Sequence, residues 1–512
     1  MQKNNADRES ILHKLQEAGG VTEENVAQVA QETGVPEADI WGAGTFYSLI
    51  RKPNALVRIC DGLTCRMRGA TNLSQQATAA GTEWEYVSCL GQCDRAPVQL
   101  DPQLNLQCFS NQTAGVSPAN PDLPINLGGP VDDRYDGLKK ALGLATDEIL
   151  ETLEQSGLQG RGGAGFPAHL KWRSVATQPE TERYVVCNAD EGEPGTFKDR
   201  EVMLRQPHKL LEGLAIAAHT VAAQDIYLYI RGEFSAERQS VETALTLALA
   251  EEQHPLQAFR FHFVDGHGAY ICGEETALLE SLEGRRGMPR MKPPFPTVSG
   301  FRGKPTLMHN VETSACVPAI LLKGGQWFRQ QGRTEAGSKL FCISGNVQHP
   351  GVYELPLGAT LQEVVDAAGG YEGTPQAFSP GGASSGFLPM NFADLPLDFT
   401  SLPKVGSMLG SAGIVVLNDK VDLRLAALWQ TQFFERESCG QCAPCRLGTQ
   451  FVQQRLNSYL QSNDADDLAA FPDIAWEMEE GSICGLGMVA AKPLESLLRH
   501  FPHLFPGVQA ST

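Results

Sequence analysis

Three cysteines stand three residues apart in the stretch 437–450, which reads ESCGQCAPCRLGTQ. Cys439, Cys442 and Cys445 form a C-x2-C-x2-C loop, which suits a [4Fe–4S] cluster because thiolates are soft, charged donors for iron. The fourth thiolate is expected from Cys484 in GSICGLG, where the glycines let the backbone come close to inorganic sulfide. Zinc is the alternative ligand, although zinc sites usually hold their ligands as two separated pairs.

A second set of cysteines forms two pairs near the N-terminus. Cys60 and Cys65 are separated by four residues and Cys89 and Cys93 by three, and each pair begins where a predicted strand ends. Two pairs of thiolates fit a [2Fe–2S] cluster, one pair to each iron, while a four-cysteine zinc site remains the alternative. We expect the other five thiols to be buried structural residues: Cys108, Cys187, Cys272, Cys316 and Cys342.

The composition is that of an acidic globular protein. The chain has 512 residues, of which 42% are hydrophobic, and a net charge of −19. An acidic surface repels phosphate backbones, so we expect no nucleic-acid partner. No apolar run reaches the roughly 18 residues of a membrane-spanning helix, and the first residues lack the pattern of a signal peptide. These features predict a cytoplasmic protein without a membrane span.

Apolar spacing and turn residues divide the chain into α/β, β-rich and helical parts. The fold class that we expect is therefore a multidomain α/β protein. The predicted parts are a helical segment (1–52), a small α/β unit (53–115), a Pro- and Gly-rich linker (116–136), a large α/β domain (137–335), a β-rich module (336–418) and a helical region (419–512).

A glycine-rich stretch, LQGRGGAGFPAHLKW, matches the pattern G-x-G-x-x-G at Gly160, Gly162 and Gly165. The dinucleotide fingerprint must follow a strand, whereas a helix is predicted before this stretch, so an ordinary Rossmann site is not expected. Glycine still lets a flat or phosphorylated ligand approach the backbone, and Phe166 can stack on a ring. A plain loop is the alternative.

Acidic residues gather in two further motifs. CNADEGEPGTFKDR (187–200) follows a predicted strand and carries Asp190, Glu191 and Glu193, which can hold sugar hydroxyls or be solvated. GAYICGEETALLESLEG (268–284) has Glu274 and Glu275 at the start of a predicted helix, where the helix dipole favours carboxylates. On this motif alone, ordinary helix capping is the favoured interpretation of this second pair.

Two short motifs complete the set of candidates. RMKPPFP (290–296) is a proline-fixed loop that presents Lys292 and Phe295. HNVET (309–313) precedes a predicted helix and can direct Asn310 and Thr313 at a phosphate, together with backbone amides.

These motifs together resemble the NADH-oxidising flavoprotein subunit of respiratory complex I, which recurs as the diaphorase of NAD-linked hydrogenases and metal-dependent formate dehydrogenases. The similarity covers roughly residues 135–505. The preceding part, with ICDGLTCRMRGA and SCLGQCDRAPVQL, resembles the thioredoxin-like [2Fe–2S] subunit of the same complexes. The chain therefore looks like a fusion of two subunits. The resemblance implies a ubiquitin-like fold for 336–418 and a helical bundle that carries the [4Fe–4S] cluster.

The resemblance also implies FMN and NAD as cofactors, with catalytic roles for Glu191, near the nicotinamide, and Tyr270. By motif position, the FMN ligands would be Gly160, Gly162, Lys171, Asn188, Asp190, Gly273, Glu274, Asn310 and Thr313. The NAD pocket would comprise Gly163, Phe166, Glu191, Glu193, Tyr270, Glu275, Lys292 and Phe295. Ser174 stands where some relatives carry a further aromatic residue.

Cofactor chemistry then predicts hydride exchange between NAD(H) and FMN, followed by one-electron transfer through the iron–sulfur clusters. The segments SPGGASSGFLP and LPLDFTSLPKVGSMLGSAGIVVL resemble the β subunit of NAD-dependent formate dehydrogenases. That resemblance implies a catalytic α-subunit partner with further iron–sulfur clusters and a molybdenum or tungsten cofactor. The alternatives are the diaphorase of an NAD-reducing hydrogenase, a complex I-like NADH dehydrogenase and a non-catalytic electron-relay scaffold.

Overall fold

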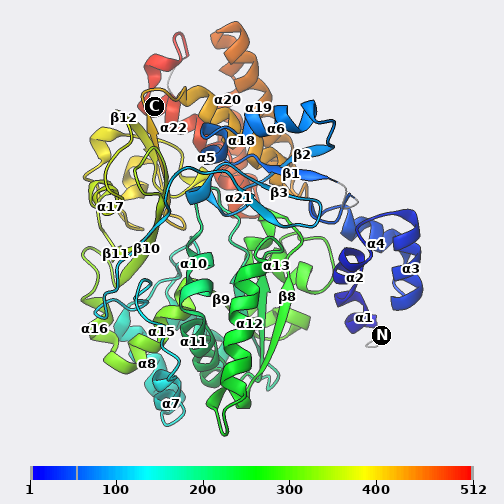
Figure 1. Cartoon of the computed structure of the whole chain (residues 1–512), viewed down its shortest axis with the longest axis vertical. Coiled ribbons are helices and arrows are strands. Elements are labelled where there is room, and N and C mark those ends of the chain that lie inside the picture. The colour runs from blue at the N-terminus through cyan, green and yellow to red at the C-terminus, as the bar shows by residue number, and fades with distance from the viewer. Residues whose placement is uncertain (1–3, 53–55, 509–512) are drawn as a thin grey trace.

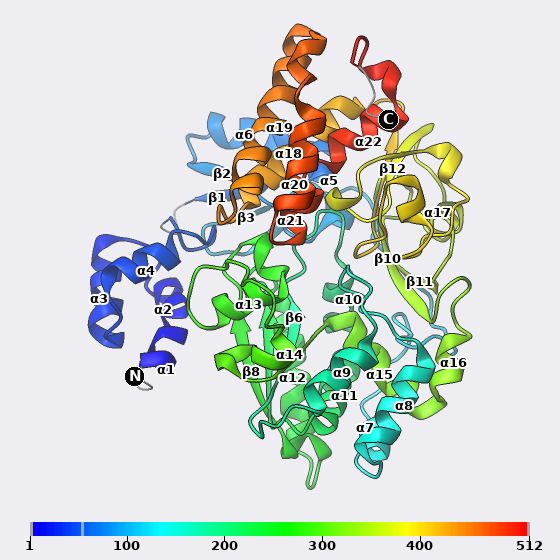
Figure 2. The same cartoon turned by 180° about the vertical axis from the view of Figure 1, so that it is seen from behind.

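The computed structural model describes residues 4–52 and 56–508. Four short helices project from one side of the molecule (Figures 1 and 2). The C-terminal helices lie at one end of the molecule, and the large parallel sheet lies toward the other end. The predicted small α/β unit begins with residues 53–55, which lie outside the described part of the chain. The projecting helices are α1 (Asn4–Glu9), α2 (Ile11–Glu17), α3 (Glu23–Thr33) and α4 (Glu37–Gly44).

The small α/β unit contains a four-stranded sheet in the order β2-β1-β3-β4. Strands β1 and β2 are parallel, and β3 pairs antiparallel with both β1 and β4. Its elements are β1 (Val57–Cys60), α5 (Leu63–Met67), α6 (Ala70–Ala79), β2 (Trp84–Val87), β3 (Val98–Leu100) and β4 (Leu106–Cys108).

The large α/β domain is built on a four-stranded parallel sheet in the order β8-β7-β6-β9. Its strands are β6 (Tyr184–Ala189), β7 (Asp225–Ile230), β8 (Arg260–Asp265) and β9 (Thr306–Asn310). The helices are α7 (Asp136–Ala141), α8 (Thr146–Ser156), α9 (Ala168–Ala176), α10 (Lys198–Arg205), α11 (Pro207–Thr220), α12 (Ser235–Leu249), α13 (Glu275–Leu282), α14 (Pro296–Ser299), α15 (Val311–Lys323) and α16 (Gly325–Arg329).

The β-rich module forms a six-stranded sheet in the order β13-β12-β14-β10-β11-β5. Its edge strand β5 (Gly115–Val116) comes from the start of the predicted linker and pairs with β11, so the linker adds to the sheet. A strand of two residues is too short to show an alternation of apolar and polar side chains, which is why the sequence did not predict it. The other elements are β10 (Ser338–Gly345), β11 (Gly351–Pro356), α17 (Leu361–Ala367), β12 (Pro375–Ser379), β13 (Leu388–Pro389) and β14 (Gly413–Asn418).

The C-terminal region is helical, as predicted. It contains α18 (Leu423–Glu437), α19 (Ala443–Ser462), α20 (Phe471–Gly481), α21 (Gly485–Val489) and α22 (Lys492–His500). Helix α18 packs against both α19 and α22. The loop with the three closely spaced cysteines connects α18 to α19 and extends into the first turn of α19.

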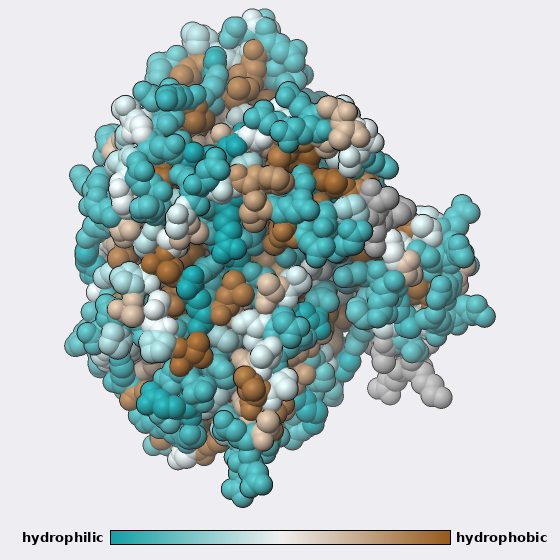
Figure 3. All heavy atoms as spheres, in the orientation of Figure 1, coloured by the Kyte–Doolittle hydropathy of each residue, from teal (hydrophilic) through white to brown (hydrophobic). Residues whose placement is uncertain are grey.

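One hydrophobic core joins parts that are far apart in the sequence. Ile11 and Ile40 of the N-terminal helices belong to the same buried cluster as Leu278 of α13 and Phe434 of α18. The β-rich module has a core of its own. The face of the molecule in Figure 3 is mainly hydrophilic, in keeping with the large net charge. None of the helices in the described ranges is long and apolar enough to cross a membrane.

Four of the five thiols expected to be structural are buried: Cys187, Cys272, Cys316 and Cys342. The prediction is wrong for Cys108, which is exposed, because it lies on β4 at the edge of the small sheet.

Candidate functional site

The carboxyl edge of the parallel sheet contains a point where the order of the strands reverses. The chain proceeds outward from β6 to β7 and β8 and then returns to the other side of β6 as β9. Asn188 at the end of β6 lies opposite Asn310 at the end of β9. In open parallel sheets, ligands bind in the crevice at such a reversal. A cavity of about 380 Å³ lies here, lined by both asparagines.

The cavity brings together ten residues that the sequence predicted for the site. They come from the glycine-rich loop before α9, the loop after β6, the turn before α13 and the end of β9. They are Gly162, Gly163, Asn188, Asp190, Glu191, Glu193, Tyr270, Gly273, Glu274 and Asn310. Asn188 Nδ2 donates to the carbonyl of Gly273 at 2.8 Å, which fastens two of these loops together.

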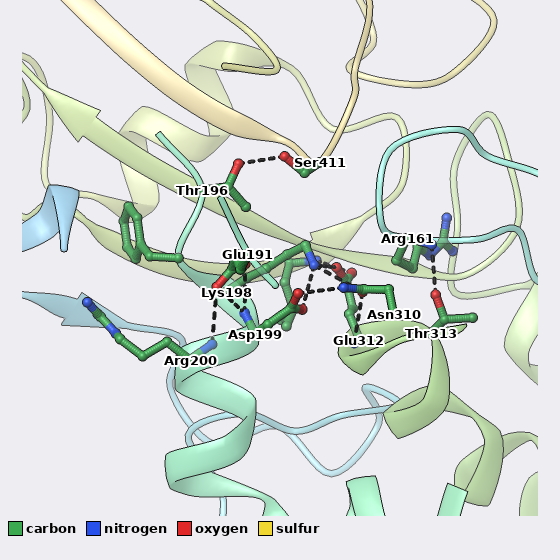
Figure 4. Close-up of polar contacts among 12 residues, drawn as sticks. Arg161, Glu191, Thr196, Lys198, Asp199, Arg200, Asn310, Glu312, Thr313 and Ser411 are labelled. Carbon is green, nitrogen blue, oxygen red and sulfur yellow. Dashed lines mark hydrogen bonds and ion pairs between the residues drawn. The ribbon is translucent and has the colours of Figure 1, made fainter. Parts of the chain in front are cut away.

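Glu191 folds back onto the start of helix α10 (Figure 4). Its carboxylate accepts the backbone N–H of Asp199 at 2.9 and 3.0 Å and that of Arg200 at 3.2 Å, so it supplies the acceptors that the first turn of a helix needs. Burial, and then the nearby charge of Asp199, raises the pKa of Glu191 to about 8. The group therefore changes its charge near neutral pH.

A buried group of charged residues reaches the wall of the cavity through Lys198 and Asp199 (Figure 4). Lys198 Nζ donates to Asp199 at 2.7 Å and to Asn310 Oδ1 at 3.2 Å and lies 3.1 Å from Glu312. Glu312 also pairs with Lys339. Burial acts to raise the pKa of Glu312, but the positive charges of Lys339, Lys198 and Arg161 outweigh this effect, so the pKa is lowered. Glu191 lies beside this group as well, so three cations are balanced by three buried carboxylates.

The buried polar atoms that lack a hydrogen-bond partner among the described residues include those of two groups in or near the cavity. They are Oδ2 of Asp190, which lines the cavity, and the Nε and Nη1 of Arg161 behind the glycine-rich loop. Burial raises the pKa of Asp190 to about 8. An unpaired buried polar atom costs about 1–3 kcal/mol, so a ligand hydroxyl that bonds to Asp190 would be stabilising.

Glycine permits close packing at one wall of the cavity. A Cβ on Gly162 would lie 3.1 Å from Cβ of Asn310, and one on Gly273 would lie 3.2 Å from the carbonyl of Asp190. The narrow crevice and the unpaired acid fit a flat ring with a polyol chain, and Lys198 lines the cavity as a cation that can pair with a phosphate. FMN has this chemistry.

Tyr270 connects the cavity to the rest of the molecule. Its hydroxyl donates to Glu193 Oε2 at 2.5 Å, its N–H donates to Glu437 Oε2 at 2.8 Å, and its ring packs edge-on against Phe433 at 4.9 Å. Burial raises the pKa of Tyr270 well above its usual range, so the hydroxyl stays protonated and is a hydrogen-bond donor.

The four thiols of the N-terminal unit converge. Cys89 Sγ and Cys93 Sγ are 3.4 Å apart, and contacts with the thiols of Cys65 and Cys89 raise the pKa of Cys60 well above its usual range. The donor set is purely sulfur and buried, which fits an iron–sulfur cluster.

The second set of thiols lies at the start of two helices. Cys442 precedes α19, Cys445 lies in its first turn, and Cys484 precedes α21. Burial raises the pKa of Cys484 to about 11, against the effect of hydrogen bonds from the amides of Gly487 and Leu486. Such amides also offset the charge of a metal-bound thiolate. Across residues 4–52 and 56–508, no three His, Cys, Asp or Glu side chains are placed to hold a metal ion.

Four family models match the chain in succession. They are the thioredoxin-like [2Fe–2S] ferredoxin over residues 2–114, the Nuo51 FMN-binding domain over 153–319, the SLBB domain over 340–388 and the NADH-ubiquinone oxidoreductase-F iron-sulfur binding region over 426–506.

Individual proteins match over long stretches. The F 2 subunit of the NADH-quinone oxidoreductase of Rhizobium meliloti (strain 1021) is 45% identical over 381 residues, which is 72% of this chain and 90% of that protein. The chain belongs to the family of NADH-oxidising F-type flavoprotein subunits. The mitochondrial NADH dehydrogenase [ubiquinone] flavoprotein 1 of Dictyostelium discoideum is 42% identical over 71% of this chain and 79% of that protein.

The likeness of this F-type subunit to a solved structure extends over its full length. The structure of an NAD⁺-reducing [NiFe]-hydrogenase in the H2-reduced state aligns with a TM-score of 0.89 and 30% identity, covering 100% of this chain and 94% of that chain. The expected fold class and cofactor domains are confirmed: thioredoxin-like [2Fe–2S], FMN-binding, SLBB and helical [4Fe–4S].

Seven of the predicted ligands do not line the cavity: Gly160, Phe166, Lys171, Glu275, Lys292, Phe295 and Thr313. The ligand roles of these seven residues, and of the ten that line the cavity, stay predictions. Phe166 and Phe295 are each 54% exposed, so both rings are accessible. Lys171 pairs with Glu275 at 2.8 Å, and Lys292 pairs with Glu274.

The helix-capping alternative for Glu274 is realised at the start of α13. Its Oε2 accepts the backbone N–H of Thr276 and Ala277, both at 2.9 Å. Thr313 Oγ1 accepts the backbone N–H of Arg161 at 2.8 Å, which ties the glycine-rich loop to α15.

The cavity has further lining residues that the sequence did not single out. Some lie within motifs that were quoted only as a whole, such as Thr196 in the loop after β6 and Lys198 and Asp199 at the start of α10. Others come from the SLBB module and the C-terminal helices, whose proximity only the folded chain reveals: Gly381, Ser384, Met408, Gly410, Ser411, Gly485, Leu486 and Val489.

Proposed function

We propose that the chain is the NAD(H)-diaphorase subunit of a larger oxidoreductase, in which the cavity at the strand reversal is the place of electron exchange. The observation that supports this most is the position of the cavity. It is lined by Glu191 of the FMN-binding domain and by Gly485, directly after the thiol of Cys484. Bound FMN would supply the ability to take up a hydride and release its electrons one at a time.

The chain's own residues would bind and orient the two nucleotides. Asp190, whose Oδ2 lacks a partner, would accept a ribityl hydroxyl, and Asn188 and Asn310 would line the ring or its chain. Lys198 would offset the phosphate charge. Tyr270 and Glu191 would face the nicotinamide, and no side chain is required as a general acid or base.

The test of this proposal is Glu191→Ala, assayed as NADH oxidation with an artificial electron acceptor. We expect turnover to fall at least about tenfold while the flavin content stays unchanged, because the group lines the cavity in which the nicotinamide would be positioned. Glu237→Ala is the matched control, since it removes a buried carboxyl of the same domain that is not part of the cavity. Unchanged kinetics of Glu191→Ala would contradict the role of Glu191.

The assembly that this protein serves is a separate question. The full-length likeness to a chain of an NAD⁺-reducing [NiFe]-hydrogenase, together with the likeness to F-type subunits of NADH-quinone oxidoreductases, favours a hydrogenase or a complex I-like dehydrogenase. The sequence favoured a formate dehydrogenase on two segments, 379–389 and 395–417. Formate oxidation, with its molybdenum- or tungsten-containing α subunit, is therefore our second candidate.

Purified native complex distinguishes these assemblies when NAD⁺ reduction is measured anaerobically with hydrogen and with formate as separate donors. Reduction with hydrogen alone would support the hydrogenase, and reduction with formate alone would restore the formate dehydrogenase. A preparation that contains iron but no flavin would instead favour the electron-relay scaffold.

A further inference from the structure

The wall of the cavity that faces the FMN-binding domain comes from a different module. Residues 379–386 of the SLBB module follow β12 and contribute Gly381 and Ser384 to the lining. We call this segment the SLBB loop. It is internally fixed, since Ser379 Oγ donates to the carbonyl of Gly382 at 2.6 Å and Ser385 Oγ accepts the N–H of Gly381 at 3.0 Å. The loop is therefore a preformed surface.

The SLBB loop contacts the FMN-binding domain at the cavity through a hydrogen bond to Glu193. The backbone N–H of Ser384 donates to Glu193 Oε1 at 2.9 Å, while the hydroxyl of Tyr270 donates to Oε2 at 2.5 Å. The carboxylate is thus held between one donor of the FMN-binding domain and one donor of the SLBB module. Two hydrogen bonds to different oxygens fix both the position and the rotation of the group.

Gly382 makes this approach possible. Its φ is +83°, and a Cβ there would lie 2.6 Å from Glu193 Oε1, 2.7 Å from Glu193 Cγ and 2.7 Å from the carbonyl of Pro194. Real Cβ atoms do not approach so closely, so any side chain would displace Glu193 or the loop. Glycine is needed here because the two modules meet at this point.

We propose that the SLBB loop is a positioning element for the nucleotide site and acts on it by holding the Glu193 carboxylate. Glu193, held in turn against Tyr270, keeps the side of the cavity that the nicotinamide nucleotide would use in one conformation. The flavin side, with Asn188 and Asp190, has no contact with this loop through these bonds. The kinetic part of this inference rests on the proposed function, whereas the structural part does not.

The test compares Gly382→Ala with Gly370→Ala in the full-length protein. Gly370 lies in the same module and also has a positive φ, +106°, but a Cβ there would meet no atom within 4 Å. Both variants carry the backbone strain of alanine at positive φ, and only the first displaces Glu193. We expect Gly382→Ala to raise the KM for NADH about tenfold, with kcat changed less than about twofold and the FMN content unchanged. Gly370→Ala should leave the KM as in the wild type.

Hydrogen exchange provides a readout that does not depend on activity. Amides of residues 191–197 should exchange at least about threefold faster in Gly382→Ala than in Gly370→Ala, because the segment loses its outer support. Faster exchange without any NADH oxidation by the wild type would keep the positioning role and reject the proposed function. Equal exchange and equal KM in both variants would overturn the positioning role.

A double-mutant cycle with Glu193→Ala identifies the path of the effect. Removing the carboxylate removes two of the three close contacts at Gly382, so this background also tolerates the added methyl group better. If the loop acts through Glu193, then Gly382→Ala should change the KM less than about twofold in the Glu193→Ala background. A tenfold rise there as well would show that the loop acts independently of Glu193 and would overturn the inference.

Discussion

The two sets of cysteines differ in how the fold encloses them. Cys93 is the most exposed thiol of the N-terminal set, at 4%, whereas Cys442 of the C-terminal set is partly exposed and Cys439 is 9% exposed. The residues that flank Cys442, Gln441 and Ala443, are exposed. Electron transfer to another protein of the assembly requires a cluster near the surface, so we expect electrons to leave through the C-terminal set.

The FMN-binding domain contributes to the enclosure of the N-terminal set. Arg231 Nη2 donates to the carbonyl of Cys89 at 2.6 Å, and Arg200 bonds to both oxygens of Asp94 at 2.9 and 2.7 Å. The ring of Phe234 packs against Gly91. The two units that are fused in this chain therefore share a buried polar interface. Mutations can test whether the N-terminal cysteines are more enclosed than the C-terminal ones.

The largest expected effect is the loss of the [4Fe–4S] cluster of the C-terminal cysteines while the [2Fe–2S] cluster remains. Cys442→Ala should abolish the EPR signal of the [4Fe–4S] cluster, because a cubane needs four thiolates, while the [2Fe–2S] signal persists. Cys108→Ala is the matched control, since it removes an exposed thiol outside both sets. A surviving [4Fe–4S] signal in Cys442→Ala would remove this residue from the ligands.

The next effect concerns the enclosure of the N-terminal set. Asp94→Ala leaves the buried Arg200 with Glu201 as its remaining carboxylate partner, which should lower the free energy of opening this unit by about 3 kcal/mol. The [2Fe–2S] absorbance should then disappear at a lower urea concentration than in the wild type. Glu363→Gln breaks the half-exposed pair with Arg333 and should cost at most about 1 kcal/mol. Equal shifts in both variants would mean that the interface does not protect the cluster.

A smaller effect is expected from pH, at the helix that lies between the cavity and the enclosed cluster. Burial and Asp199 raise the pKa of Glu191 to about 8, above the roughly 4.3 of a free glutamate. Since the folded state binds this proton more tightly, the stabilisation is complete below about pH 4.3 and is lost as the pH rises to 8.

We expect the free energy of unfolding to fall by about 2 kcal/mol between pH 6 and 8, and Glu191→Gln to flatten this slope. Urea unfolding at each pH, monitored by tryptophan fluorescence, measures this free energy. In Glu363→Gln the slope should stay as in the wild type, because hydrogen bonds from Arg333 already lower the pKa of Glu363 to about 2. An unchanged slope in Glu191→Gln would show that other groups cause the pH dependence.

Local sequence patterns predicted the parts of the fold that local interactions determine. The spacing of Cys439, Cys442 and Cys445 and the strand at 184–189 needed no tertiary information. The short strand β5 and the SLBB wall of the cavity were missed, because both depend on contacts between residues more than 180 positions apart, such as Ser384 with Glu193. Glu191 was found as a candidate, but its bonds to α10 follow only from the fold.

The most direct measurement of the central claim is anaerobic addition of NADH to the purified protein, with flavin absorbance and iron–sulfur EPR recorded together. The wild type should lose its flavin absorbance and develop the [4Fe–4S] signal, whereas Cys442→Ala should lose the flavin absorbance alone. Protein that contains flavin and both clusters but shows no change with NADH would contradict the account.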